Sequence, residues 1–187
     1  MGTTAIALII VAVLVIWAIL IYNRLVKLRN NRENAFADID VQLKQRHDLI
    51  SQLVETVKGY AKHEQGVLEN VVSLRNAAAG ATTVDDKIAA ETKLNSALAG
   101  LKVTLENYPD LKANQNFLQL QGEMSDIENK LSAVRRFFNS ATKELNNAVQ
   151  TFPSNIFAGV FGFKKEPMFD LGTTERAALE VAPQIKF

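Results

Sequence analysis

The chain has 187 residues, a formal net charge of +1, and no cysteine. This length suits one domain with an appendage, and the near-neutral charge gives no electrostatic case for nucleic acid, which is bound by strongly basic faces. The absence of cysteine excludes disulfides and thiolate metal sites, and no Gly-rich phosphate loop or G-x-S-x-G motif is present.

The first predicted element is a membrane span. The run AIALIIVAVLVIWAILIY extends from Ala5 to Tyr22 without a charge, and as a helix it is about 27 Å long, close to the thickness of a bilayer's hydrocarbon core. A cleaved signal peptide would need a charged segment before the run and a small-x-small cleavage site after it, and neither is present. We therefore expect a short N-terminal tail over 1–4 and a retained transmembrane helix over 5–23, which contacts lipid through residues 5–22.

Flanking charge predicts the orientation of this span. Four basic residues follow it and none precedes it, namely Arg24, Lys27, Arg29 and Arg32. The excess of Lys and Arg on one side of a span marks the cytoplasmic side. The chain is therefore predicted to cross a membrane in a single pass, with the N-terminus outside and the rest of the chain cytoplasmic.

A long helix is predicted to follow over residues 24–79. Its apolar residues fall on two interleaved heptad series, Ile39, Leu53, Tyr60, Val67 and Leu74, and Phe36, Leu43, Ile50, Val57, Val71 and Ala78. This spacing is typical of a helix with one buried seam. Arg46 and Glu64 interrupt the seam, and a charge buried there needs a partner.

Two further helices are predicted, over 84–106 and 113–152. Thr82 and Thr83 before Asp85 and Asp86 are typical of a helix N-terminus, and Pro109 ends the second helix. The third carries an unbroken series spaced by seven, Phe117, Met124, Leu131, Phe138, Leu145 and Phe152. The fold class is therefore all-α, a single N-terminal transmembrane helix followed by an elongated antiparallel three- or four-helix bundle over 24–152.

The C-terminal segment, 153–187, begins with a phenylalanine-rich stretch and is predicted to contain a short helix over 174–182. Three helices that run away from the membrane, back, and away again would place this stretch far from the bilayer. It is then either a cap on the open end of the bundle or a contact surface for another copy or a partner. The candidate contact residues are Phe152, Phe157, Phe161, Phe163, Lys164 and Lys165.

The two histidines do not form a metal site within one chain. His47 and His63 are separated by sixteen helical positions, so their side chains would point about 160° apart, and neither the Glu-x-x-His nor the H-E-x-x-H pattern is present. We predict no catalytic residue, no metal and no cofactor. The alternative is a site built between neighbouring copies from His47, Asp48 and His63.

Arg46 and Glu64 lie about 27 Å apart along one helix, so they cannot pair with each other. A carboxylate of the third predicted helix, Glu123 or Glu128, is the expected partner of Arg46. The alternative is an arginine that extends to the rim of the bundle and keeps its charge in water.

Several blocks of this sequence resemble the LemA family. They are YNRLVKLRNNRENAFADIDVQLKQRHDLISQLVETVKGYAKHE directly after the span, NYPDLKANQNFLQLQGEMSDIENKLSAVRRFFN, and FPSNIFAGVFGFK. Residues 46–49 fall on the family's R-H-D-L, residues 109–111 on its Y-P-x-L, and Arg135, Arg136 and Asn139 on its R-R-x-Y-N, with Phe138 in place of Tyr. The resemblance implies a membrane-anchored helical bundle without established enzymatic activity, associated with envelope maintenance and sometimes with a membrane zinc protease. Together with the resemblance, the predicted location is the bacterial inner membrane.

Taken together, the sequence predicts a non-enzymatic, membrane-anchored scaffold that forms homo-oligomers or docks a membrane partner such as an envelope protease. The runner-up is an extracytoplasmic or inter-subunit binding module, with or without a metal. An extracytoplasmic receptor would require the opposite orientation of the span.

Overall fold

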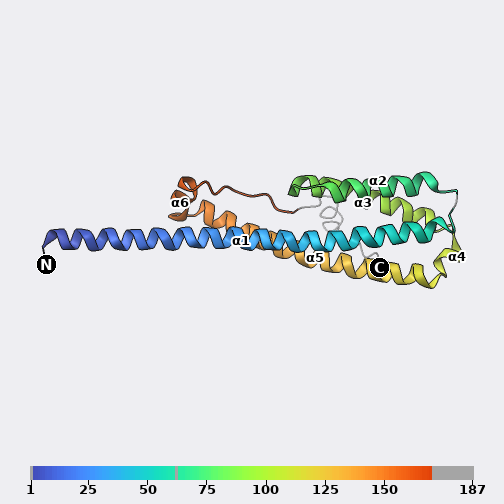
Figure 1. The fold of residues 1–187 in the computed structure, drawn as a ribbon, viewed down its shortest axis with the longest axis horizontal. Helices are drawn as coiled ribbons and strands as arrows, with labels where there is room; N and C mark the ends of the chain where they lie inside the picture. The colour runs from blue at the N-terminus through green and yellow to red at the C-terminus, as the bar shows by residue number, and fades with distance from the viewer. Residues whose placement is uncertain (1, 62, 170–187) are drawn as a thin grey trace, which may run out of the picture. The chain divides into compact units, whose positions relative to one another are not determined.

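The computed structural model describes residues 2–61 and 63–169, so the helix predicted over 174–182 lies outside the described residues. Within these ranges all regular structure is helical (Figure 1). The helices are α1 (Thr3–Lys58), α2 (Gln65–Gly80), α3 (Val84–Leu105), α4 (Pro109–Lys112), α5 (Gln115–Gln150) and α6 (Ser154–Val160). The predicted all-α class is confirmed.

The chain forms two compact units. Of the described residues, the first contains 2–40 with 132–168, and the second contains 41–131 with Phe169. The two longest helices, α1 and α5, each contribute one part to each unit.

The helix predicted over 24–79 is wrong, because α1 ends at Lys58 and α2 starts at Gln65. The helix closes with the N–H groups of Tyr60 and Ala61 both donating to the carbonyl of Val57, each at 2.9 Å. Gly59, a poor helix former, directly follows its last residue. Apolar residues keep helical spacing on both sides of the turn, so periodicity alone does not reveal it.

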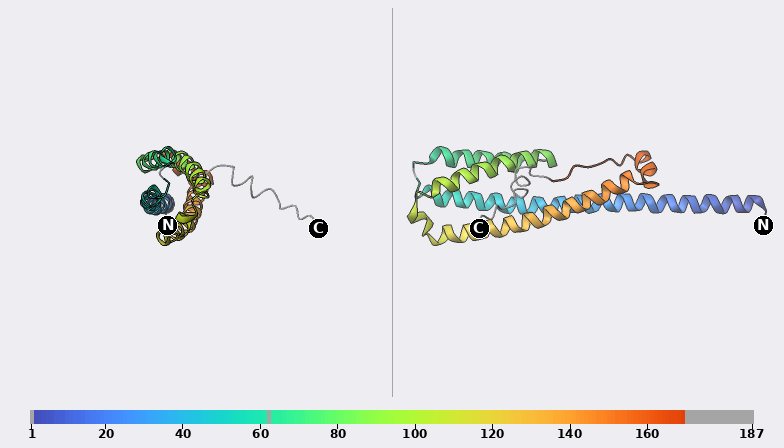
Figure 2. Two further views of the ribbon diagram at one scale, coloured as in Figure 1. Left: turned by 90° about the vertical axis from the view of Figure 1, so that its right-hand side faces the viewer. Right: turned by 180° about the vertical axis from the view of Figure 1, so that it is seen from behind.

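This turn changes the path of everything that follows. In the second unit the chain leaves along α1, returns along α2, leaves again along α3 and returns along α5 (Figure 2). The predicted path had one reversal fewer, so its last helix ran away from the span. In the structure α5 instead runs back, and its C-terminal part packs beside the first part of α1 in the first unit.

The second unit is held by an apolar core that draws on all of its helices. Its largest members that are almost fully buried include Ile50 of α1, Leu94 and Leu101 of α3, Leu111 of α4 and Phe117 of α5. Burial of each such side chain stabilises the fold by roughly 1.5–3 kcal/mol. The same core fixes the polar side chains that α1, α3 and α5 bring between them.

Local signals define α3. The side chain of Thr83 accepts a hydrogen bond from the N–H of Asp86 at 3.1 Å, and Asp85 and Asp86 lie in the first turn, where negative charge is favourable. α3 and α5 lie within two residues of the ranges predicted from the sequence.

The first unit contains the apolar run. One helix, α1, is long and apolar enough to cross a membrane, and no part of its most apolar window is buried. Below that window, Leu25 packs with Ala148 of α5 and Ala158 of α6. Further along, the rings of Phe36 and Phe138 lie 5.6 Å apart.

Candidate functional site: a buried polar network

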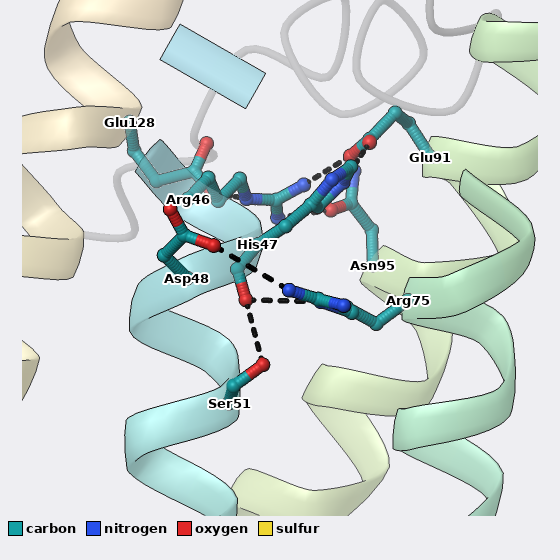
Figure 3. A network of polar contacts seen from close by, with 8 residues as sticks. All are labelled: Arg46, His47, Asp48, Ser51, Arg75, Glu91, Asn95 and Glu128. Carbon is teal, nitrogen blue, oxygen red and sulfur yellow. Dashed lines mark hydrogen bonds and ion pairs between the residues drawn. The ribbon is translucent and has the colours of Figure 1, made fainter. Parts of the chain in front are cut away.

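Arg46 lies at the centre of a polar network inside the second unit (Figure 3). Only 3% of this residue is exposed. Its Nη1 donates to Oε2 of Glu91 on α3 at 2.5 Å, and its Nη2 donates to Oδ1 of Asn95 one turn further along. Its Nε lies 2.6 Å from Oε1 of Glu128 on α5 in an ion pair. One guanidinium thus joins three helices.

Glu91 is the buried anion of this network. It is fully buried, and its two carboxylate oxygens have different partners. Oε2 accepts from Arg46, and Oε1 lies 2.7 Å from Nε2 of His47, which is itself buried. Consecutive residues of α1 therefore hold the two oxygens of one carboxylate, which fixes the rotation of α1 against α3.

The backbone of α1 is also bound at this level. The carbonyl of His47 accepts hydrogen bonds from Nε of Arg75 on α2 and from the hydroxyl of Ser51, each at 3.1 Å. Nη2 of Arg75 lies 3.5 Å from the exposed carboxylate of Asp48. Figure 3 shows these contacts on the side of α1 that faces α2. Residues 46–48 thus connect α1 to each of the other long helices of the unit.

The energetics favour a structural role for this network. Removing ions from water costs several kcal/mol each, which only close pairing and additional hydrogen bonds offset. Arg46 meets this requirement with one fully buried carboxylate and one, Glu128, whose side chain is 41% exposed. A buried network of this kind specifies the register of the helices and leaves its charged groups occupied with one another.

The other predicted seam charge, Glu64, forms a hydrogen bond and no ion pair with the residues that the structure describes. It lies in the turn between α1 and α2, where its Oε1 accepts a hydrogen bond from the hydroxyl of Tyr108 at 3.2 Å. Burial raises the pKa of Tyr108, and the hydrogen bond to Glu64 and its negative charge raise it further. Nearby, Nδ2 of Asn114 donates to the hydroxyl of Tyr60 at 2.8 Å. These contacts fasten the turn at 59–64 to the segment that leads from α3 into α5.

The remaining predicted polar residues lie on the surface. Glu123 accepts a hydrogen bond from Gln119 on the exposed face of α5, and Arg46 pairs with Glu128 instead. His63 is exposed in the turn after α1, whereas His47 is buried against Glu91. The described residues contain no cluster of three or more His, Cys, Asp or Glu side chains that could hold a metal ion.

The phenylalanine-rich segment lies in the first unit, against α1. The rings of Trp17 and Phe157 are 5.8 Å apart, and the ring of Tyr22 lies 4.8 Å from that of Phe161 and 6.2 Å from that of Phe163. The expectation that this segment lies far from the membrane span is therefore wrong. The physical reason is the missed turn after Lys58, which sends α5 back toward the N-terminal part of α1.

The candidate contact residues of this segment fall into two groups. Phe157 and Phe163 are half-buried against α1, whereas Phe152, Phe161, Lys164 and Lys165 are exposed. The chain after α6 is held to α5 by Asn146, whose side chain exchanges two hydrogen bonds with the backbone of Glu166, at 2.9 and 2.8 Å. Arg32 of α1 adds an ion pair to Glu166 at 3.3 Å.

Comparison with known proteins gives the family. The sequence model of the LemA family matches residues 35–187. This chain belongs to the LemA family. It is similar to a protein named LemA from Metamycoplasma hominis, at 26% identity over 162 residues, which covers 86% of this chain and 74% of that protein.

Two of the blocks that resemble LemA proteins supply residues to the polar network and to the apolar core. The R-H-D-L block supplies Arg46, His47 and Asp48 to the polar network. In the Y-P-x-L block, Leu111 is fully buried and Pro109 starts α4. The apolar run that is long enough to cross a membrane lies before the residues that the LemA model matches.

Sequence reasoning missed Glu91, Asn95 and Arg75. Glu91 had a usable signal, because it occupies the seven-residue series of the second predicted helix, between Val84 and Leu98. A charged residue in a seam is the same anomaly that drew attention to Arg46. Arg75 and Asn95 have no such signal, because polar residues on the flank of a helix are usually solvated.

Proposed function

We propose that this LemA-family protein is a non-enzymatic, membrane-anchored scaffold whose helical bundle self-associates or docks a membrane partner. The observation that carries the proposal is the continuity of α1. This helix is fully exposed and apolar at its start, and it supplies Arg46, Ile50, Val54 and Val57 to the core of the second unit. One continuous helix therefore serves as the membrane anchor and as part of the bundle core.

The polar network favours a structural role over a catalytic one. Arg46, His47 and Glu91 are buried and engaged with one another, so a substrate would have to displace these contacts to reach them. For the same reason His47 is not available to a neighbouring copy, which removes the main residue of the inter-copy metal site considered from the sequence.

Self-association has a candidate surface on α5. Phe137 is 57% exposed beside the fully buried Phe138. Copies held in one membrane are concentrated in two dimensions, so a weak lateral contact suffices. We propose that parallel copies meet through the face that carries Phe137. In keeping with the family resemblance, the scaffold acts in envelope maintenance, with a membrane protease as one partner class.

Two measurements on the full-length protein in its membrane test this proposal. A reporter enzyme active only in the cytoplasm, fused after Phe187, should be active, since the basic residues after the span predict a cytoplasmic bundle. An active fusion to an extracytoplasmic reporter would show the opposite orientation and contradict this part.

The second measurement tests assembly. The chain has no cysteine, so Phe137→Cys introduces a unique thiol. Oxidation should produce dimers for Phe137→Cys but not for Ser132→Cys, which is exposed on the same helix about 140° around its axis. Equal yields at both positions, or none at either, would contradict a specific lateral contact through this face.

A further inference from the structure

A group of large apolar side chains remains exposed on α6 and on the residues directly before and after it. Phe152 is 75% exposed, Val160 74%, Ile156 55% and Phe161 53%. Ile156 and Val160 are four residues apart, so they lie on one face of the short helix. Four such side chains close together form a patch of the kind that marks an interaction site.

This patch is continuous with the apolar surface of α1. Contacts between aromatic rings join Trp17 to Phe157, and Tyr22 to Phe161 and Phe163. A small apolar core of Leu25, Ala148 and Ala158 fixes α6 in this position, with Ile21 and Leu28 packed around it. Figures 1 and 2 both show α6 beside α1.

The contacts define the depth of α6 relative to the span. The turn at Phe152, Pro153 and Ser154 lines the same cavity as Trp17 and Ile21. Tyr22 ends the uncharged run, and aromatic residues of this kind mark the membrane interface. Because α1 rises about 1.5 Å per residue, Trp17 lies about 7–8 Å deeper than Tyr22. Helices that lie in the interface bury their apolar face by about 5–10 Å, so the depths agree.

The positions of the basic side chains agree with this depth. The chain leaves α6 toward the level of Arg29, whose guanidinium lies 5.3 Å from the ring centre of Phe163. Lys164 and Lys165 follow directly and are exposed, as are Arg24 and Lys27 on α1. A bilayer that ends near Tyr22 would place the apolar side chains on its own side and the basic ones at the level of the lipid phosphates.

Hydrogen bonds within the turn lower the free-energy cost of moving its backbone out of water. The N–H of Thr151 donates to the carbonyl of Asn147, and that of Asn155 donates to the carbonyl of Thr151, each at 2.9 Å. The hydroxyl of Ser154 lies 2.6 Å from the carbonyl of Ala148. Paired backbone groups lower the cost of entering the membrane. Asn155 remains exposed, which suits the interface and not the hydrocarbon centre.

We propose that α6 is a second membrane contact, an interfacial segment that inserts Phe152, Ile156, Val160 and Phe161 into the leaflet from which the span emerges, with Lys164 and Lys165 on lipid phosphates. The proposal rests on the proposed role of residues 5–22 as an anchor. Lipid is favoured over a protein partner because the patch continues the surface of the anchor at interfacial depth. The first unit then contacts the membrane at two places, through residues 5–22 of α1 and through α6.

Spin labelling of the full-length protein in lipid nanodiscs tests this. Ile156→Cys and Val160→Cys receive a nitroxide, and Val103→Cys is the matched control, a valine of similar exposure (68%) on α3 in the second unit. Accessibility to oxygen, which concentrates in lipid, is compared with accessibility to a water-soluble nickel complex. A label at position 10 within the span verifies that the anchor itself is inserted.

Labels at 156 and 160 should favour oxygen over nickel and report a depth of about 5–10 Å below the phosphates, whereas the label at 103 should favour nickel. Preference for nickel at 156 and 160, with the label at 10 in lipid, would overturn the second contact and leave the anchor intact. Exclusion of both reagents, together with spin–spin broadening that disappears when labelled protein is diluted with unlabelled protein, would show a second copy on this surface and would also overturn it. A label at 10 in water would instead refute the anchor.

Discussion

Replacing Glu91 with glutamine tests whether the polar network holds the second unit together. The substitution keeps the size of the side chain and removes its charge. Among the described residues, Arg46, whose side chain is 4% exposed, then keeps Glu128 as its counter-ion, and that carboxylate is 41% exposed. His47 loses its anionic partner as well.

The magnitude follows from these contacts. Breaking a buried ion pair by removing one partner costs about 3–5 kcal/mol. The glutamine oxygen still accepts one hydrogen bond and Glu128 remains, so we expect the lower end, about 3 kcal/mol. For a chain of this size each kcal/mol lowers the melting temperature by about 2–4 °C, which gives a decrease of about 6–12 °C.

Thermal unfolding of the detergent-solubilised protein, followed by far-ultraviolet circular dichroism, measures this decrease. Glu123→Gln is the control, because Glu123 is exposed and accepts a hydrogen bond from its neighbour Gln119, and it should stay within about 0.5 kcal/mol of the parent. If Glu91→Gln melted together with this control, the network would not be a source of stability and the reasoning would fail.

Two further predictions concern the same unit. Arg46→Leu alone should destabilise the protein by about 3–5 kcal/mol, because it leaves the buried carboxylate of Glu91 without its cationic partner. Arg46→Leu combined with Glu91→Leu should recover most of this loss. If thermal unfolding showed the double variant to be no more stable than Arg46→Leu, direct pairing would be refuted. Tyr108 has a raised pKa in the folded protein, so its contribution to stability is present below about pH 10 and is lost as the pH rises through the folded value. Tyr108→Phe should therefore show a shallower loss of melting temperature above about pH 10, and parallel profiles would refute the contact with Glu64.

The sequence predicted the helices far better than their directions. Heptad spacing identifies α5 because Phe117, Leu131, Phe138 and Leu145 form one buried stripe. The same spacing concealed the turn after Lys58, since Val57 and Ala61 before α2 and Leu68 and Val71 within it are all buried in one core. Helical periodicity shows which face of a helix is buried, but it does not show in which direction the helix runs. One missed turn therefore reversed the predicted direction of each helix after it.

The candidate site shows the same limit. The position of Arg46 in a seam indicates that it needs a partner, and the structure places Glu128 beside it. The main anion, Glu91, comes from a different helix, and only the packing of α3 on α1 selects it. Contacts that depend on the relative rotation of two helices are set by the whole core and are not encoded in either segment alone.

The composition of the first unit has a consequence for biosynthesis. Its parts come from the two sides of the sequence, with Arg32 bound to Pro167 across 135 residues of chain. Residues 41–131 of the second unit are continuous and leave the ribosome earlier. The apolar N-terminal part of α1 is therefore translated first but gains its partners α5 and α6 last. During this interval Leu25 and the residues around it lack the side chains that cover them in the folded protein.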